Sequence, residues 1–532
     1  MSTLLDYLSE YVDSDLVSFH MPGHKGARFF KAHGYSDVLD RLVDMDITEI
    51  DGADNLYKPE SVIKQMMDDY AQLYDVLATY LLVGGSSAGI IAAIMAAVNS
   101  YTHRQSINGS LDTHGMKRDF VSQLERNILD NPRDNPMIVM ARNSHKSVYN
   151  AVRLCNATPM YLYPETLESG VSGGIAPQPV RELLQELSAN HVAAVVIPSP
   201  NYYGICSDIK AIADICHEYG TLLIVDEAHG AHLKFMNEPL AAEANGADIV
   251  IMSTHKTLAT FTSTALLHIC SARVNRYAVE DALQMIQTTS PSYMMLASFA
   301  MCAEIIKQNK QKLFMDWAEN LDWFYNRSHY NQSQHMDGLE ILDVPMLDRT
   351  KMNISLKPIG ISGAELEKLL IEHGIIPELV SGDYVMCMTG IGNVKQDYVK
   401  LYDAILDIIC QNQKKSSLNN LSAMPQTMMG GVTVSAIVAC DEDDVHCCVG
   451  GRLDNRVNRS IDDASIGFEW ISLEYAMNRK SGAMIIPYPP GIPIIVQSEI
   501  FTKEVILEIQ RYLDMGTKVL GIRENHVLVS EI

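Results

Sequence analysis

A lysine and an aspartate stand where they could do chemistry together. Lys256 follows the apolar run Ile249–Met252, and Asp226 directly follows the apolar run Leu222–Val225. A lysine at the end of a buried strand can be desolvated, which lowers its pKa and makes its amine a nucleophile for Schiff-base chemistry. An aspartate there can keep a pyridine nitrogen protonated, and a protonated ring is an electron sink for a carbanion. Taken alone, Lys256 could be an ordinary solvated lysine and Asp226 an acid that caps a helix or lies in a loop. Their separation of thirty residues, however, suits two neighbouring strands whose ends face one pocket.

A glycine-rich turn offers a place for a phosphate. The segment Gly84-Gly85-Ser86-Ser87-Ala88-Gly89 follows an apolar run and leads into a helix-like stretch. Glycines permit a tight turn, and the free N–H groups of a helix N-terminus attract a phosphate. The segment lacks Gly-Lys-[Ser/Thr], so it is not a nucleoside-triphosphate loop.

The same segment also matches G-x-S-x-G, the nucleophile elbow of α/β-hydrolases. Ser87 would be the nucleophile, and Asp226 followed by a later histidine would give the order of that triad. Against this alternative, no His-Gly-Gly-Gly precedes the motif to build an oxyanion hole, and Lys256 would have no role. The hydrolase therefore remains a remote alternative.

A histidine follows another apolar run. His145 lies in Asn143-Ser144-His145-Lys146-Ser147, shortly after Met137–Ala141. Single histidines are more often structural than functional. A place at the carboxyl end of a strand nevertheless favours a ring that stacks on a flat cofactor.

A sheet is needed to bring these residues together. Short, nearly continuous apolar runs separated by helical stretches, with Ser86–Val98 and Ile209–Tyr219 the clearest, predict an α/β fold with a parallel sheet covered on both faces. Ligands of such sheets gather at the carboxyl ends of the strands. The predicted strands are Tyr80–Val83, Met137–Ala141, Val192–Ile197, Leu222–Val225, Ile249–Met252 and Ala265–Ile269.

The chain of 532 residues is too long for one core, so several domains are expected. The polar stretch Tyr101–Pro136 reads as an insertion, and Gln411–Gln426 reads as a linker before a third unit. A smaller α/β unit between them has a strand at Met352–Leu356 and a helix at Ala364–His373. The predicted division is an N-terminal segment 1–65, a large domain 66–300 with an insertion at 103–136, a small α/β domain 301–412 and a C-terminal domain 427–532.

Composition excludes some classes of partner. Lys and Arg number 41 against 65 Asp and Glu, a net charge of −24, which argues against nucleic acid as the main partner. No apolar run of about 18 residues is present, and the N-terminus lacks the pattern of a signal peptide. The ten cysteines are scattered without C-x-x-C. We therefore expect a cytoplasmic protein with reduced thiols, no membrane span and no metal.

Several segments in order resemble the Orn/Lys/Arg decarboxylases, which are pyridoxal 5'-phosphate (PLP) enzymes of fold type I. Several long motifs in the right order are far more specific than any one of them. The resemblance implies an aspartate aminotransferase-like large domain with a mostly parallel sheet, a small α/β domain and a C-terminal α+β domain. The matching segments are Phe19–Gly26, Asn143–Ser147, Val225–His232, Ser253–Leu258, Thr289–Tyr293 and Pro487–Pro493.

The resemblance implies a role for individual residues. Lys256 would hold PLP as a Schiff base, and Asp226 would pair with the pyridine nitrogen. His145 would stack on the ring, and His229 would lie near its other side. The remaining cofactor contacts, chiefly to the phosphate, would come from Ser86, Ser87, Ala88, Ser253 and His255. Family members build the site at a subunit interface, which implies a homodimer or a small multiple of dimers, with Thr289–Tyr293 close to the partner's cofactor.

The implied activity is decarboxylation of a basic L-amino acid, as in polyamine synthesis. Arginine is the first choice, because the compact chain resembles the biosynthetic form without an N-terminal wing domain, and lysine or ornithine come next. Two departures keep another PLP reaction on an arginine-like substrate open, namely elimination, cyclisation or transamination. They are the insertion, and Phe261-Thr262-Ser263 in place of the expected Thr-Gln-Ser. A non-catalytic paralogue is disfavoured because Lys256 and Asp226 are intact.

Overall fold

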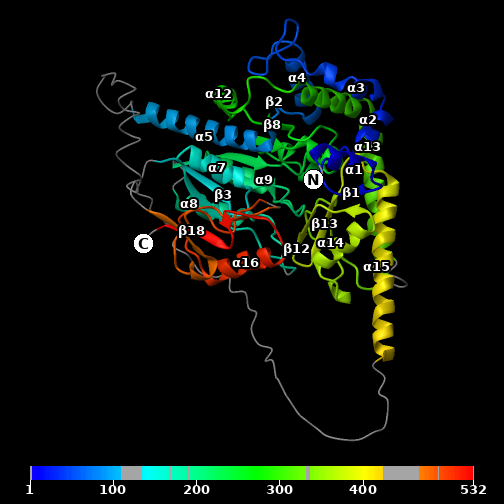
Figure 1. Ribbon diagram of the computed structural model, residues 1–532. Coiled ribbons are helices and arrows are strands. Elements are labelled where there is room, and N and C mark those ends of the chain that lie inside the picture. Colours follow the sequence, from blue (N-terminus) through cyan, green and yellow to red (C-terminus); the bar gives the residue numbers. More distant parts are fainter. Residues whose placement is uncertain are drawn as a thin grey trace, which may run out of the picture.

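The computed structural model describes residues 3–109, 135–167, 169–187, 191–330, 336–422, 467–488 and 491–530 (Figure 1). Most of the predicted insertion and residues 427–466 of the predicted C-terminal domain therefore lie outside the described part of the chain. Within that part, none of the helices is long and apolar enough to cross a bilayer.

A seven-stranded sheet forms the centre of the large domain. Its order is β2-β8-β7-β6-β5-β3-β4, and only β8 runs against the other strands. All six predicted strands are present within one or two residues. The strands are β2 (Ala78–Leu82), β3 (Met137–Ala141), β4 (Thr158–Leu162), β5 (Val192–Pro198), β6 (Leu222–Asp226), β7 (Ile249–Met252) and β8 (Ala265–Ile269).

The strands are continuous in apolar residues because both faces of the sheet are covered. Along β6, Leu223 and Val225 pack into one core, whereas Leu222 and Ile224 pack into the core on the other face. Two groups of helices supply the covering layers. The first core includes α4 (Val62–Tyr74), α8 (Pro177–Glu186), α9 (Ile209–Glu218) and α13 (Tyr293–Tyr330), and the second includes α5 (Gly85–Gly109), α7 (Lys146–Leu154) and α12 (Arg276–Ile286).

The small domain is built on an antiparallel sheet. Its strand order is β12-β13-β10-β9, and the predicted strand and helix correspond to β10 (Lys351–Ser355) and α14 (Gly363–Glu372). The N-terminal segment joins this domain through β1 (Val17–Ser18), which pairs in parallel with β11 (Ile375–Ile376). The other strands are β9 (Glu340–Ile341), β12 (Leu379–Ser381) and β13 (Tyr384–Met388).

Two long helices run through predicted boundaries. The linker predicted at Gln411–Gln426 is wrong for residues 411–422. Those residues belong to α15, which spans Lys395–Ser422 without a break. This stretch contains no Gly or Pro, and its Lys, Gln and Leu residues favour a helix, so polarity alone misled the prediction. Likewise, α13 passes through residue 300 without interruption (Figure 1).

The C-terminal unit combines strands and a helix around a small core of its own. In Figure 1 it lies beside β3 and α7, coloured orange to red. Its elements are β14 (Phe468–Ser472), β15 (Ile486–Pro487), α16 (Lys503–Asp514), β16 (Val519–Leu520), β17 (Ile522–Arg523) and β18 (His526–Ser530).

Candidate active site

The predicted site residues lie together at the carboxyl ends of the parallel strands. Asp226 is the last residue of β6, and Lys256 lies in α11 (Thr254–Thr257), the short turn after β7. These strands are parallel neighbours, with Asp226 opposite Ile251. His145 follows β3, and the turn before α5 follows β2. All four strands present their carboxyl ends here, which is where such sheets bind ligands.

Lys256 is held by a histidine. Its Nζ lies 2.9 Å from Nε2 of His229. Burial lowers the pKa of Lys256, although the negative charge of Asp226 opposes this effect. Burial also lowers the pKa of His229 well below its usual value, and the positive charge of Lys256 adds to the effect. A neutral imidazole can accept a hydrogen bond from the amine, and the lowered pKa of Lys256 favours the neutral, nucleophilic form of that amine.

Asp226 is a buried acid. Only 6% of it is exposed, and its Oδ1 accepts a hydrogen bond from the N–H of Ala228 at 3.2 Å. Burial raises the pKa of Asp226, whereas the charge of Lys256 lowers it. A buried carboxylate is favoured by a cationic partner, and a protonated pyridine nitrogen would supply one. In the hydrolase alternative Asp226 would bond to a histidine, but here its Oδ1 bonds to the backbone N–H of Ala228.

His145 caps the helix that follows β3. Its Nδ1 accepts from the N–H of Ser147 at 3.3 Å and lies 2.8 Å from that residue's Oγ. Burial, together with the charge of Lys256, lowers the pKa of His145 to about 4, so the ring is neutral at pH 7. A neutral, oriented imidazole suits stacking on a flat ring.

The predicted phosphate ligands follow the carboxyl ends of the same group of strands. Ser86, Ser87 and Ala88 form the first turn of α5, where backbone N–H groups have no partner within the helix. Ser253, which precedes α11, is buried, and its Oγ has no hydrogen-bond partner among the described residues. A phosphate oxygen would satisfy that hydroxyl, so this arrangement fits the phosphate group of PLP.

His255 fits the phosphate less simply. Its Nδ1 donates to the carbonyl oxygen of Thr264 at 2.7 Å, and burial lowers its pKa to about 4. The neutral ring therefore carries its proton on Nδ1, and Nε2 can only accept. His255 could donate to a phosphate only after gaining a second proton, a change that the phosphate's own negative charge would favour.

The N-terminal motif lies directly against the lysine turn. Gly23 donates its N–H to the carbonyl oxygen of His255 at 2.7 Å and accepts from the N–H of Gly392 at 2.9 Å. A Cβ on Gly23 would lie 2.6 Å from the carbonyl oxygen of Leu258, so only glycine fits between the two segments. The motif thus links the lysine turn to the small domain.

Sequence reasoning missed a buried acid near the lysine. Glu378 accepts hydrogen bonds from Nδ1 of His20 at 2.8 Å, the N–H of Met21 at 3.0 Å and the hydroxyl of Tyr202 at 2.8 Å. Burial raises the pKa of Glu378, but the hydrogen bond and charge of His20 outweigh it and lower the pKa. Tyr202 in turn packs edge-on against His229, with ring centroids 4.8 Å apart. Glu378 stands in no motif, so no local pattern signalled it.

A second missed group supports His229 from behind. Nζ of Lys351 donates to the carbonyl oxygen of His229 at 2.7 Å and to Oδ2 of Asp348 at 2.8 Å. Oδ1 of Asp348 also lies 3.1 Å from Nε2 of His232. Burial raises the pKa of Asp348, but the charge of Lys351 outweighs burial and holds that pKa far below its usual range. This pair is fully desolvated, with 0% and 3% of the two side chains exposed.

Lys351→Met is expected to lower the free energy of unfolding by about 3–5 kcal/mol, because it leaves Asp348 as a buried charge without its main partner. Lys210→Met, which removes one partner of the exposed Lys210–Asp214 pair on α9, is the control and is expected to cost less than about 1 kcal/mol. Urea unfolding of both variants measures the difference. Equal midpoints would contradict the importance of the buried pair.

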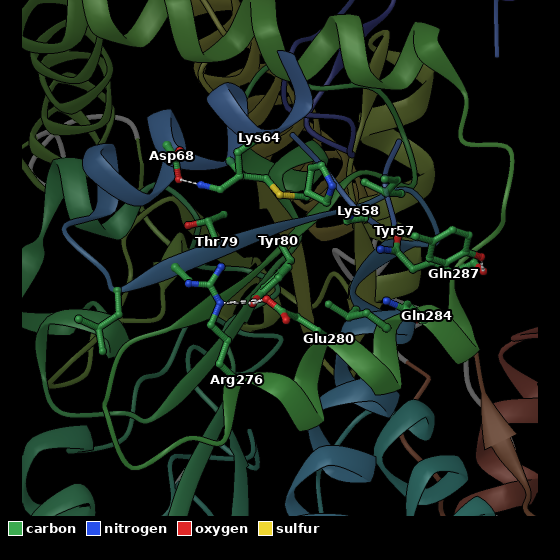
Figure 2. Close-up of a pocket in the computed structure, with 16 residues that line it drawn as sticks. Tyr57, Lys58, Lys64, Asp68, Thr79, Tyr80, Arg276, Glu280, Gln284 and Gln287 are labelled. Carbon is green, nitrogen blue, oxygen red and sulfur yellow. Dashed lines mark hydrogen bonds and ion pairs between the residues drawn. The ribbon is translucent and has the colours of Figure 1, made fainter. Parts of the chain in front are cut away.

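A separate hollow of about 240 Å³ lies between α4, β2 and α12 (Figure 2). Its walls carry two ion pairs formed within single helices, Lys64 with Asp68 and Arg276 with Glu280. None of the predicted site residues lines it. The candidate site is therefore the region at the carboxyl ends of the parallel strands, and not this hollow.

The segment Thr289–Tyr293 contacts the N-terminal segment in the single chain. Tyr293 donates to the carbonyl oxygen of Asp54 at 2.6 Å, and Thr289 and Ser290 are exposed. A place beside a partner's cofactor stays a prediction.

A mostly parallel sheet, with an acid at the end of one strand and a lysine after the neighbouring strand, is typical of PLP-dependent enzymes of fold type I. Within that class, the chain belongs to the Orn/Lys/Arg decarboxylase family. The model of the family's major domain matches residues 2–103 and 128–349, and the model of its C-terminal domain matches residues 463–520. The gap between the two major-domain matches coincides with part of the predicted insertion.

Curated relatives and solved structures agree with this placement. The chain is 27% identical over 520 residues to an arginine decarboxylase of Bacillus subtilis (strain 168), covering 97% of this chain and 94% of the relative. An arginine decarboxylase of Bacillus anthracis is 25% identical, covering 97% and 94%. The fold is similar to that of the Francisella novicida lysine decarboxylase, with a TM-score of 0.66 at 18% identity, covering 100% of this chain and 81% of that one.

Proposed function

We propose that this enzyme uses PLP bound to Lys256 to decarboxylate a basic L-amino acid to its amine and carbon dioxide, with arginine as the first choice. The observation that carries the proposal is the placement of Asp226 and Lys256 at the carboxyl ends of two neighbouring parallel strands, in a chain that belongs to a decarboxylase family. The relatives named arginine decarboxylase favour arginine, and lysine or ornithine come next.

The residues at these strand ends fit PLP. Asp226 offers a buried anion for the ring nitrogen, Ser253 offers an unpartnered hydroxyl, and the first turn of α5 offers N–H groups for the phosphate. When bound, PLP supplies an electron sink for the pair of electrons left when the carboxylate departs as carbon dioxide.

The protein's own groups prepare this chemistry. Burial lowers the pKa of Lys256, which favours the neutral amine, and Nε2 of His229 lies 2.9 Å from Nζ and orients it. Beside a protonated pyridine nitrogen, Asp226 would stay ionised and would in turn favour the protonated form of that nitrogen. His145 covers a flat ring, while Tyr202 and Lys351 fix His229 through its ring and its carbonyl oxygen.

We also propose a cytoplasmic homodimer, or a small multiple of dimers. Exposure of Thr289 and Ser290 in the single chain supports this arrangement, because a second subunit could contact these two residues. Sedimentation of the purified protein tests the assembly.

Carbon dioxide release from carboxyl-labelled arginine, lysine and ornithine tests the proposed reaction. We expect release from all or some of these substrates, with kcat/KM for arginine at least about tenfold above the others. A parallel preparation of Lys256→Ala protein corrects for contaminating activity. If arginine is consumed without release of carbon dioxide, another PLP reaction replaces decarboxylation.

A further inference from the structure

The C-terminal domain touches the candidate site directly. Residues 491–499, here named the contact segment, lie against the chain that follows β3. Lys146, the residue after His145, donates its N–H to the carbonyl oxygen of Gly491 at 3.0 Å. Val496 of the same segment packs into the core that covers one face of the large sheet. The segment is therefore fixed to the large domain at the end of β3.

Arg142 fastens the contact segment in place. Its Nη1 donates to the carbonyl oxygen of Pro493 at 2.7 Å, and its Nη2 donates to that of Ile494 at 3.0 Å. Nη2 also pairs with Oε2 of Glu499 at 3.1 Å, and only 14% of the arginine side chain is exposed. A planar guanidinium that reaches several acceptors at once fixes orientation better than a lysine could. Arg142 stands three residues before His145.

Gly491 leaves no spare room beside His145. A Cβ on Gly491 would lie 3.0 Å from Cδ2 and 3.1 Å from Nε2 of that ring. Nδ1, on the other side of the ring, is held by Ser147. The imidazole is therefore confined between its own helix and the backbone of the C-terminal domain.

We propose that Gly491 and Arg142 are positioning residues through which the C-terminal domain sets the His145 ring for cofactor binding. The proposal rests on the proposed function, because it takes His145 as the residue that covers the PLP ring. On this proposal the C-terminal domain does more than cover the large domain, because it also helps to shape the cofactor site.

Gly491→Ala and Gly516→Ala form a matched pair that separates this contact from backbone strain. Both glycines lie in the C-terminal domain with positive φ, +86° and +71°, so alanine strains the backbone at each. A Cβ on Gly516 meets nothing within 4 Å, whereas a Cβ on Gly491 meets His145. We expect Gly491→Ala to weaken PLP binding to the apoenzyme about tenfold, and Gly516→Ala to change it less than about twofold. Thermal unfolding of both apoenzymes checks that they fold.

A double-mutant cycle with His145→Ala tests whether the effect passes through the ring. If Gly491 acts by placing His145, adding Gly491→Ala to His145→Ala changes PLP affinity less than about twofold. The same tenfold loss in both backgrounds would overturn the proposal.

A readout without cofactor keeps this proposal distinct from the proposed function. Carbethoxylation of His145 in the apoenzyme, followed by mass spectrometry, reports how firmly the ring is held. Arg142→Lys adds no Cβ and loosens the contact segment, so it serves even if Gly491→Ala fails to fold. We expect Arg142→Lys and Gly491→Ala each to raise the rate of His145 modification several-fold, and Gly516→Ala to leave it unchanged. An unchanged rate in Arg142→Lys would overturn the positioning role, whereas failure of every variant and the parent to bind PLP would overturn only the proposed function.

Discussion

Lys256→Ala is expected to give a folded protein that is colourless after purification and releases carbon dioxide at least about a thousandfold more slowly than the parent. The amine is the group that would bind PLP covalently, and nearby lysines are engaged elsewhere. Nζ of Lys351 contacts Asp348 and the carbonyl of His229, and Nζ of Lys25 contacts the carbonyl of His20. The absorption spectrum and a carbon dioxide assay measure the two losses.

Lys312→Ala is the control for this substitution. Lys312 is an exposed residue of α13 that pairs with Asp316, one turn along the same helix. The control should stay yellow and fully active. A yellow, active Lys256→Ala enzyme would show that a different lysine carries the cofactor.

Asp226→Asn is expected to lower the rate of carbon dioxide release by about a thousandfold while substrate still binds. The amide keeps the shape of the side chain but removes the anion that holds the ring nitrogen protonated, so the electron sink is weakened. Substrate binding depends on Lys256 and the phosphate contacts, which the substitution leaves intact. Single-turnover kinetics, following substrate binding and carbon dioxide release separately, distinguishes the two steps.

Asp248→Asn provides a buried acid with a purely structural role for comparison. Asp248 precedes β7 at the other end of that strand, and its Oδ2 accepts from the N–H of Leu223 at 2.8 Å and lies 3.0 Å from Nε2 of His217. We expect this variant to be less stable but to release carbon dioxide at the parent rate per folded molecule. Release by Asp226→Asn at near the parent rate would make Asp226 a structural cap of the turn at Ala228.

The central sheet could be predicted from the sequence because its strands are buried on both faces. Strands such as Val192–Pro198 and Ile249–Met252 are therefore continuous apolar runs. The strand Thr158–Leu162 was not predicted, because it is the outermost strand of the sheet, is only partly buried and contains Pro159. The reversed direction of Ala265–Ile269 leaves no mark in its composition. The helix through Ser422 was missed because a polar surface helix and a polar linker share the same residues.

Some residues of the candidate site could likewise be predicted from the sequence, and others could not. Lys256, Asp226 and His145 could be located because each follows a recognisable strand, and strand ends converge whatever their separation along the chain. Glu378 and Lys351 could not, because they reach the site from the small domain across more than a hundred residues of chain. A single polar residue within such a domain carries no pattern, and only the folded contacts give it a role.

Borohydride reduction of the purified enzyme, followed by peptide mapping, tests the assignment of Lys256 most directly. Reduction makes a Schiff base permanent, so the modified peptide identifies the lysine that held the cofactor. We expect one pyridoxyl adduct per chain, on the peptide that contains Ser253-Thr254-His255-Lys256. An adduct on Lys25, Lys146, Lys351 or any other lysine, or no adduct on a protein that releases carbon dioxide, would contradict the assignment.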